Sequence, residues 1–201
     1  MCKIIVMANR KGGVAKTSST RNLAYSLAEL GKKVLAVDFD PQTNLTISFG
    51  VAPAALQETA ASLMMKLVMD EVLPEKASYI LNIGKVDLLP SKKTLTVAEV
   101  NLLIERKDDC LAQLLAPLRA DYDYILVDTG PSLGSLTINA FTAADEIIIP
   151  VDPELFALVG LKELTETISK IKQNLNPKVE IIGILFTKCS KRTTLYRQTS
   201  E

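Results

Sequence analysis

Short runs of consecutive apolar residues alternate along the chain with segments in which apolar residues recur every three or four positions. These mainly apolar runs occupy residues 4–8, 34–37, 86–90, 124–127, 146–151 and 179–186, with Asp87, Glu146 and Glu180 as their acidic members. Runs of this length are typical of strands that are buried on both faces of a parallel sheet. The sequence therefore predicts an α/β fold in which four or five strands alternate with helices and are joined by right-handed crossovers.

Helical periodicity accounts for most of the segments between these runs. In residues 18–30 the leucines fall on one face, and Gly31 is a natural helix stop. The same spacing predicts further helices at 54–70, at 96–118 (as one or two helices) and at 156–174. The methionines of the second helix are explained by core packing.

The composition indicates one ordinary globular domain over residues 1–201. The chain is 48% apolar and 23% charged, and it contains no repeat, low-complexity tract or linker. Lysine plus arginine equals aspartate plus glutamate, at 23 each, so nucleic-acid binding requires a local basic patch or the pairing of two subunits. The absence of histidine excludes imidazole chemistry and histidine-ligated metals.

Cysteine usage and hydropathy bear on where the protein works. Cys2, Cys110 and Cys189 are far apart and form no C-x-x-C pair, so neither a zinc site nor a disulfide framework is indicated. This pattern favours a reduced, cytoplasmic setting. No apolar run approaches the roughly 18 to 20 residues that span a bilayer, so we expect no membrane insertion.

The most informative stretch is rich in glycine. Residues 11–17 read Lys-Gly-Gly-Val-Ala-Lys-Thr and lie between the first apolar run and a helix that starts near Ser18. A glycine loop in this position turns backbone N–H groups inward and adds the positive end of the helix dipole, which makes it a phosphate cradle. In such a cradle Lys16 reaches the outer phosphates and Thr17 holds Mg²⁺. The alternative interpretation is a glycine turn with two solvated lysines.

The loop departs from the ordinary P-loop in a specific way. The pattern G-x-x-x-x-G-K-[ST] would require glycine at Arg10 and Ala15, whereas the variant K-G-G-x-x-K-[ST] fits the sequence. The variant has an extra lysine, Lys11. In a dimer this lysine can cross to the partner's nucleotide and offset phosphate charge, as an arginine finger does.

Carboxylates follow two of the predicted strands. Asp38 and Asp40 come at the end of the run at 34–37, and Asp128 ends the run at 124–127 in the Walker B manner. Ligands bind at the carboxyl ends of strands in doubly wound sheets, and carboxylates there suit a magnesium-bound nucleotide. Taken separately, each of these sites is also explained as a strand-ending turn, because aspartate, proline and asparagine favour turns.

Together the motifs resemble those of the deviant Walker ATPases and, within them, the ParA/Soj partition proteins. The resemblance rests on K-G-G-x-x-K-T, on D-x-D-P-Q-x-N at 38–44 and on D-T-G-P at 128–131, and it runs over essentially the whole chain. It implies a P-loop NTPase fold with a mostly parallel, twisted sheet and helices on both faces. The family continues for another strand or two, so the C-terminal part of this chain is expected to be short or missing.

The resemblance also implies roles for individual residues. The catalytic residues would be Lys11, Lys16 and Asp40, with Asp40 orienting the attacking water. ATP would be held by Lys11, Gly12, Gly13, Val14, Ala15, Lys16, Thr17, Ser18, Glu154, Thr187 and Lys188. Mg²⁺ would be held by Thr17, Asp38 and Asp128. Duplex DNA would be contacted, without sequence preference, by Lys188, Lys191 and Arg192. A plain loop carboxylate stays an alternative for Glu154, as a solvated turn does for the basic cluster.

The function implied by this resemblance is ATP-dependent DNA partition. ATP would be sandwiched between two copies of the chain, and the dimer would bind non-specific duplex DNA on the nucleoid. Slow hydrolysis, stimulated by a ParB-like partner, would release the DNA.

Several other functions occur on the same scaffold. A MinD-like regulator of division-site placement needs a C-terminal amphipathic helix, which residues 1–201 lack. A phosphate-transferring synthetase needs a substrate pocket that the sequence does not reveal, and a nitrogenase iron protein needs cysteines near Asp128. Two departures from the family pattern, Ala15 for glycine and Gly130 for proline, also leave open a non-hydrolysing nucleotide switch. Alanine adopts positive φ less readily than glycine, and loss of the proline should loosen the loop that senses the γ-phosphate.

Overall fold

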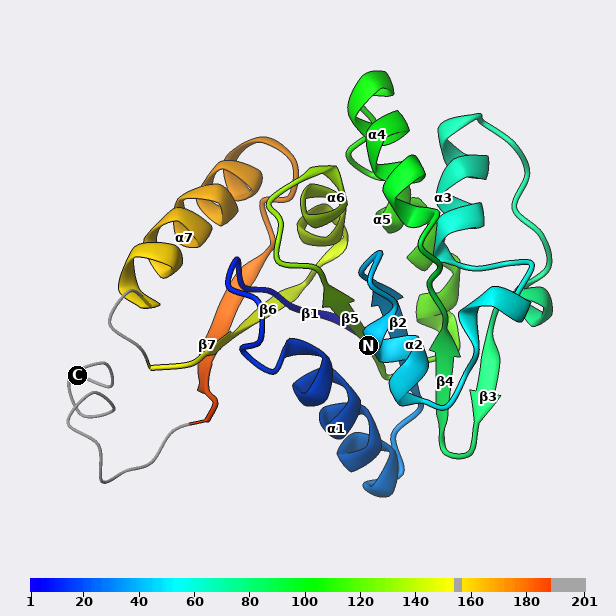
Figure 1. The fold of residues 1–201 in the computed structure, drawn as a ribbon, viewed down its shortest axis with the longest axis horizontal. Coiled ribbons are helices and arrows are strands. Elements are labelled where there is room, and N and C mark those ends of the chain that lie inside the picture. Colours follow the sequence, from blue (N-terminus) through cyan, green and yellow to red (C-terminus); the bar gives the residue numbers. More distant parts are fainter. Residues whose placement is uncertain (154–156, 189–201) are drawn as a thin grey trace.

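Seven strands form one sheet in the part of the chain that the structure describes, residues 1–153 and 157–188 (Figure 1). In this computed structural model the strands are β1 (Lys3–Met7), β2 (Val34–Phe39), β3 (Leu81–Ile83), β4 (Val86–Leu89), β5 (Tyr124–Thr129), β6 (Glu146–Val151) and β7 (Glu180–Phe186). Their order across the sheet is β3-β4-β2-β5-β1-β6-β7. Strand β3 pairs antiparallel with β4, and the other neighbouring pairs are parallel. The predicted mostly parallel sheet is confirmed, but the expected number of four or five strands was wrong.

Helices cover both faces of this sheet, as predicted (Figure 1). One face carries α1 (Lys16–Glu29) and α2 (Asn44–Ser48). The other face carries α3 (Ala60–Val68), α4 (Leu95–Glu105), α5 (Cys110–Leu115), α6 (Ser135–Ala143) and α7 (Ala157–Asn174). Among the described residues, no helix combines the length and the apolar character that crossing a membrane requires.

Each face of the sheet has its own apolar core. Strand β2 contributes side chains to both cores, which explains why its sequence is continuously apolar. Leu35, Val37 and Phe39 point into the core beneath the larger helical layer. Val34 and Ala36 point into the smaller core beneath α1 and α2. Because successive side chains of a strand point to opposite faces, a strand covered on both sides needs apolar residues at every position.

The predicted helix at 54–70 begins later than expected. Pro53–Ala55 forms a short 3₁₀ turn (η1), and the helix proper starts at Ala60. The reason is a cap: the Thr59 side chain accepts from the backbone of Ser62, and the Ser62 hydroxyl accepts from the N–H of Thr59 at 2.8 Å. This reciprocal arrangement satisfies helix N–H groups at the start of α3 and fixes where it begins. The segment predicted at 96–118 is two helices, α4 and α5, and Arg106 between them has φ 53°.

Three elements were missed in the sequence analysis. Helix α2 has five residues and β3 has three, so neither is long enough to show a period. Helix α6 is buried nearly all round, including Thr137 and Asn139. Its polar side chains are buried and bonded to backbone carbonyls, for example Thr137 Oγ1 to Ser132 O at 2.6 Å and Asn139 Nδ2 to Lys107 O at 2.9 Å, so the helix lacks the alternation of apolar and polar faces that reveals a helix in sequence.

Strand β5 determines where the chemistry of the molecule is concentrated. It lies between β1 and β2, and its register places Asp128 beside Met7 on one side and Asp38 on the other. The loops that follow these three central strands therefore meet at the carboxyl edge of the sheet. This is the edge at which open α/β sheets bind ligands.

Candidate functional site

A cavity of about 520 Å³ opens at the carboxyl edge of the central strands. Three loops and one strand end contribute to it: the glycine loop after β1, the loop after β2, the loop after β5 and the residue beyond β7. The lining residues are Gly12, Gly13, Ala15, Lys16, Thr17, Ser18, Asp40, Gln42, Asn44, Pro131 and Lys188. The structure thus brings together six of the eight residues predicted in the loop at 11–18, with Asp40 and Lys188.

The glycine loop delivers the N-terminus of α1 to this cavity. Gly13 has φ 73°, and Ala15, the residue that precedes α1, has φ 62° and ψ 29°. The first N–H groups of a helix have no partner within it, and they carry partial positive charge. Since Lys16, Thr17 and Ser18 line the cavity, these donors lie at its wall, where an anion binds best.

Lys16 adds a cation at the base of the loop. Its side chain is buried, and Nζ donates to Asn9 O at 2.9 Å and to Lys11 O at 3.3 Å. Burial lowers the pKa of Lys16, and the negative charges of Asp128 and Asp40 oppose that effect. The ammonium group is held by carbonyl oxygens rather than by a tight ion pair, so its charge is available to a phosphate.

Thr17 and Asp128 form the central pair of the site. Thr17 Oγ1 donates to Asp128 Oδ2 at 2.6 Å, while Asp128 Oδ1 is buried without a partner. Burial raises the pKa of Asp128 to about 7, and the neighbouring charges of Asp38 and Asp40 add to the effect. A buried carboxylate oxygen without a donor is costly unless a cation or water satisfies it.

These two side chains fit a magnesium ion. Mg²⁺ is commonly bound through one or two carboxylates together with substrate phosphates and water. Among the described residues, no group of three or more histidine, cysteine, aspartate or glutamate side chains could hold a metal unaided. A metal at Thr17 and Asp128 would therefore need the oxygen atoms of a bound phosphate.

The two carboxylates after β2 have different surroundings. Asp40 lines the cavity, and its Oδ1 accepts from Gln42 N at 2.9 Å. Asp38 does not line it: Asp38 Oδ2 accepts from Thr46 N at 2.7 Å and from Thr46 Oγ1 at 2.6 Å. Burial raises the pKa of Asp38 to about 6. Asp38 thus anchors α2 to the end of β2, and its predicted contact with the metal stays a prediction.

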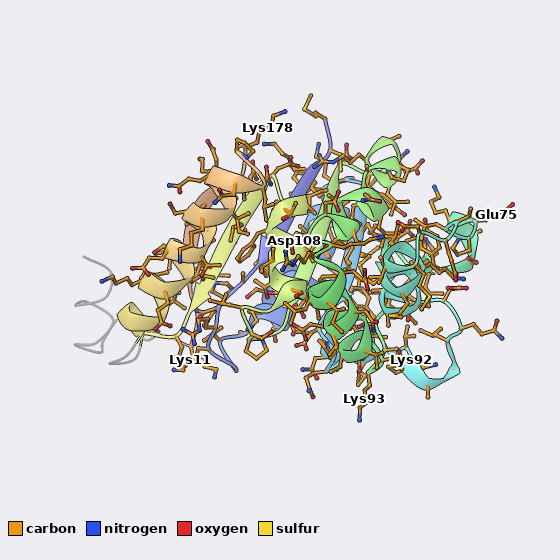
Figure 2. The ribbon with its side chains drawn as sticks, turned by 90° about the horizontal axis from the view of Figure 1, so that it is seen from above. Lys11, Glu75, Lys92, Lys93, Asp108 and Lys178 are labelled. Carbon is orange, nitrogen blue, oxygen red and sulfur yellow. The ribbon has the colours of Figure 1, made fainter. Side chains whose placement is uncertain are left out.

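The end of β7 also reaches the glycine loop. Thr187 Oγ1 donates to Val14 O at 3.1 Å, and Lys188 lines the cavity with its Nζ 3.8 Å from Asp152 Oδ2. Lys11 is exposed at the same edge of the molecule, as Figure 2 shows, and it is not part of the cavity wall. Three predicted residues lie outside the described part of the chain: Glu154, Lys191 and Arg192.

Sequence reasoning missed four residues of the site. Gln42 and Asn44 belong to the D-P-Q-x-N motif but had no assigned role, and Pro131 belongs to the loop after β5. Asn9 connects the glycine loop to the end of β6: its Nδ2 donates to Pro150 O at 2.6 Å and its Oδ1 accepts from Lys11 N at 3.0 Å. The position of Asn9 directly after an apolar strand was the available signal.

Comparisons with known proteins show the family to which this chain belongs. A family model described as an AAA domain, AAA_31, matches residues 2–181. An uncharacterized protein of Mycobacterium tuberculosis is 41% identical over 98% of this chain, which spans 61% of that relative's length. The sporulation initiation inhibitor protein Soj of Bacillus subtilis is 39% identical over 100% of this chain and 78% of its own.

Solved structures agree with the fold. A structure of cobyrinic acid a,c-diamide synthase from Mycobacterium smegmatis, with bound ADP and magnesium, is 35% identical with a TM-score of 0.91, over 100% of this chain and 80% of that one. A plasmid partition protein from Borrelia burgdorferi is 30% identical with a TM-score of 0.81, over 98% and 83% of the two chains. The chain is a P-loop NTPase of the AAA_31 domain family and belongs to the ParA/Soj group within it.

Proposed function

We propose that this chain is an ATP-dependent DNA-partition ATPase, which binds ATP with Mg²⁺ in the 520 Å³ cavity and hydrolyses it slowly. One observation carries the proposal: the Thr17–Asp128 pair with its unpartnered buried oxygen lies beside the Lys16 ammonium group and the open N-terminus of α1. A divalent cation and a polyphosphate together satisfy all of these groups, and neither does so alone.

The phosphates would be held by the glycine loop and by Lys16. The N–H groups at the start of α1 supply hydrogen bonds, and Lys16 supplies charge. Thr17 and Asp128 would hold Mg²⁺, which neutralises phosphate charge when bound. Displacing the Thr17 hydrogen bond frees both Asp128 oxygens for this purpose.

Asp40 would position the attacking water. It is the carboxylate of the loop after β2 that faces the cavity, and the Gln42 N–H fixes one of its oxygens at 2.9 Å. Lys11 would supply further charge to the nucleotide of a second copy, because it sits at the open edge rather than in its own cavity. An ATP-bridged homodimer is the form that this arrangement favours.

The dimer would bind duplex DNA through its phosphates on the nucleoid, in the cytoplasm, and a ParB-like protein would stimulate release. Lys188, Lys191 and Arg192 are the proposed DNA contacts, since they form a basic cluster in the chain directly after β7. Pairing two copies doubles that patch, which a chain with no net charge needs for binding a polyanion. The name of the Borrelia burgdorferi plasmid partition protein supports a role in partition.

The decisive experiment measures binding to non-specific duplex DNA at low salt with ATP, with ADP and without nucleotide. We expect tight binding with ATP alone, weakened by added salt and by Arg192→Ala, whereas Lys178→Ala at the opposite edge (Figure 2) has no effect. Lys16→Ala should abolish nucleotide binding and DNA binding together. Equal DNA binding in all three nucleotide states would contradict the proposal.

A synthase is the second candidate, favoured by the likeness to the Mycobacterium smegmatis structure. The same experiment separates the two functions. A chain that binds ATP but no DNA in any nucleotide state would be assigned to a regulator or an enzyme, such as a synthase, on the same scaffold.

A further inference from the structure

A second cavity lies next to the nucleotide-binding edge and has no role in the chemistry described above. Its volume is about 400 Å³, and it lies between the loop before α2, the 3₁₀ turn η1 and the segment after β4. Its lining residues are Thr43, Ile47, Pro53, Ala54, Lys92, Lys93 and Thr94. No acidic residue lines it among those the structure describes.

The walls of this cavity suit an apolar side chain. Ile47 is 56% exposed, although Leu45 and Thr46 of the same helix are buried, so a large apolar side chain is left open to solvent at the cavity. Pro53, Ala54 and the aliphatic stems of the lysines extend that surface. Burial of one leucine-sized side chain here would remove apolar area from water on both partners.

The charge at the rim suits a carboxylate. Lys92 Nζ donates to Leu56 O at 3.0 Å, and neither Lys92 nor Lys93 forms an ion pair within residues 1–153 and 157–188. Figure 2 shows both lysines on the same edge of the molecule as Lys11. Two neighbouring unpaired cations beside an apolar cavity are complementary to an acidic segment that carries an apolar residue.

Buried hydrogen bonds connect this cavity to Asp40. Thr43 N donates to Asp40 O at 2.9 Å, and Ser91 Oγ donates to the same oxygen at 3.2 Å. Ser91 N donates to Thr46 Oγ1 at 2.9 Å, and Thr46 in turn donates to Asp38. Ser91, Thr46 and Asp38 are fully buried. Thr43 lies in the cavity wall, and Thr46 and Ser91 are each next in the chain to a residue that does, Ile47 and Lys92.

The connecting loop also stores strain. Thr43 has φ 59°, a conformation that a β-branched residue rarely adopts, and it is the residue that precedes α2. Strained backbone of this kind clusters at switch segments. A ligand that contacts Thr43, Ile47 or Lys92 therefore acts on a loop whose backbone is strained next to Asp40.

We infer that the 400 Å³ cavity binds a peptide segment of a partner protein, which inserts one apolar side chain and presents a carboxylate to Lys92 and Lys93, and that this binding moves Asp40 through Ser91 and Thr46. The binding half of this inference stands on the cavity alone. The regulatory half rests on the proposed function, because it makes the segment an effector of hydrolysis.

Binding is tested by NMR on the full chain without nucleotide. The probe is the peptide acetyl-Glu-Leu-Asp-amide, and the controls are acetyl-Glu-Ser-Asp-amide and acetyl-Lys-Leu-Lys-amide. We expect saturable shifts of the Thr43, Ile47 and Thr94 amides with the probe only. Ile47→Asp and Lys93→Glu should weaken binding at least about tenfold, a loss of about 1.4 kcal/mol. Equal shifts with a control peptide, or shifts confined to the glycine loop, would overturn the site, as would self-association through this surface.

Matched variants separate the cavity from general surface effects. Val72→Asp changes a 91% exposed valine elsewhere, and Lys178→Glu changes a lysine at the opposite edge. Both should leave probe binding unchanged. Loss of binding in either would show that charge or surface apolarity alone accounts for the effect.

The connection to Asp40 is read from the Gln42 amide, which donates to Asp40 Oδ1. Probe binding should shift this amide in the wild type, and Ser91→Ala should reduce the shift at least about threefold while probe affinity stays the same. An unchanged Gln42 shift in Ser91→Ala would overturn the proposed connection. Because these measurements need no ATP turnover, their failure is distinguishable from failure of the ATPase proposal, which the DNA-binding experiment tests.

Discussion

Thr17 Oγ1 donates a 2.6 Å hydrogen bond to Asp128 Oδ2, which ties the first turn of α1 to the tip of β5 while leaving Asp128 Oδ1 without a partner. The pair holds a carboxylate in a site that disfavours its charge. The charged carboxylate lowers the free energy of unfolding of the nucleotide-free protein, and it is also the group that can bind a cation. Its effects can be measured separately from catalysis.

Asp128→Asn should stabilise the nucleotide-free fold at high pH and abolish magnesium-dependent nucleotide binding. Burial raises the pKa of Asp128 from 3.8 to about 7, so between these values the folded state binds more protons than the unfolded state. The contribution of Asp128 to stability therefore falls as pH rises through this window. We expect the variant to exceed the wild type by on the order of 2 kcal/mol at pH 8, with little difference near pH 4.

Urea denaturation at the two pH values measures this effect. Asp121→Asn changes an exposed aspartate and provides the control. A variant that is less stable than the wild type at pH 8 would show that Asp128 is not destabilised by burial.

Ala15→Gly should stabilise the protein. Ala15 has φ 62°, where an alanine Cβ is crowded and glycine is not. We expect a gain of about 1 kcal/mol in the free energy of unfolding. The matched change Ala24→Gly, at a fully buried position within α1, should instead cost about 1 kcal/mol or more. Thermal denaturation of the two variants should show shifts of opposite sign, and equal signs would contradict this account of the loop.

Gly130→Ala should slow hydrolysis while sparing nucleotide affinity. A Cβ at Gly130 would lie 3.2 Å from Asp40 Oδ1, so the carboxylate must move by a few tenths of an ångström. Since Asp40 is the proposed water-orienting group, turnover should fall roughly tenfold, with nucleotide affinity within about threefold of wild type. Gly160→Ala, which meets no atom within 4 Å, is the control. Unchanged turnover in Gly130→Ala would show that hydrolysis does not depend on where the Asp40 carboxylate lies in this structure.

Lys11→Ala should retain nucleotide binding by the monomer and lose the ATP-dependent dimer. Lys11 lies outside its own cavity wall at the open edge, where the glycine loop faces solvent. Sedimentation velocity with ATP measures the dimer, and nucleotide titration measures binding. Lys178→Ala at the far edge is the charge-matched control. A normal ATP dimer in the Lys11 variant would refute the cross-subunit role.

The sequence predicted which of these side chains come together because they belong to segments that follow parallel strands. Asp40 and Asp128 lie at or just beyond the carboxyl end of a parallel strand, and Lys16 and Thr17 begin the helix that follows the loop after β1, so the topology brings all four together. The position after a strand could not show that Asp40 faces the cavity whereas Asp38 bonds to Thr46. Alternation along β2 places Asp38 on the α2 side, where the Thr46 donors occupy it, and this depends on a five-residue helix that has no periodic signal.

Supporting contacts were beyond sequence reasoning for a different reason. The hydrogen bonds from Ser91 to Asp40 and from Asn9 to Pro150 join residues that are 51 and 141 positions apart. The position of Asn9 directly after a strand marks it as a candidate for the site, but neither its partner nor the partner of Ser91 can be read from local composition. Their roles follow only from the strand order, which periodicity does not determine.

The position of β5 also has a consequence for how the protein is made. Strands β1 and β2 have no contact in the sheet, and each pairs with β5. At roughly 5–20 residues per second, a ribosome needs several seconds after completing β2 to produce the strand that joins them. During that interval the nascent chain holds the glycine loop but not Asp128, and its first two strands have unpaired apolar edges. The proposed Thr17–Asp128 metal pair therefore cannot form during this interval, and chaperones that cover strand edges should matter most before Thr129 has emerged.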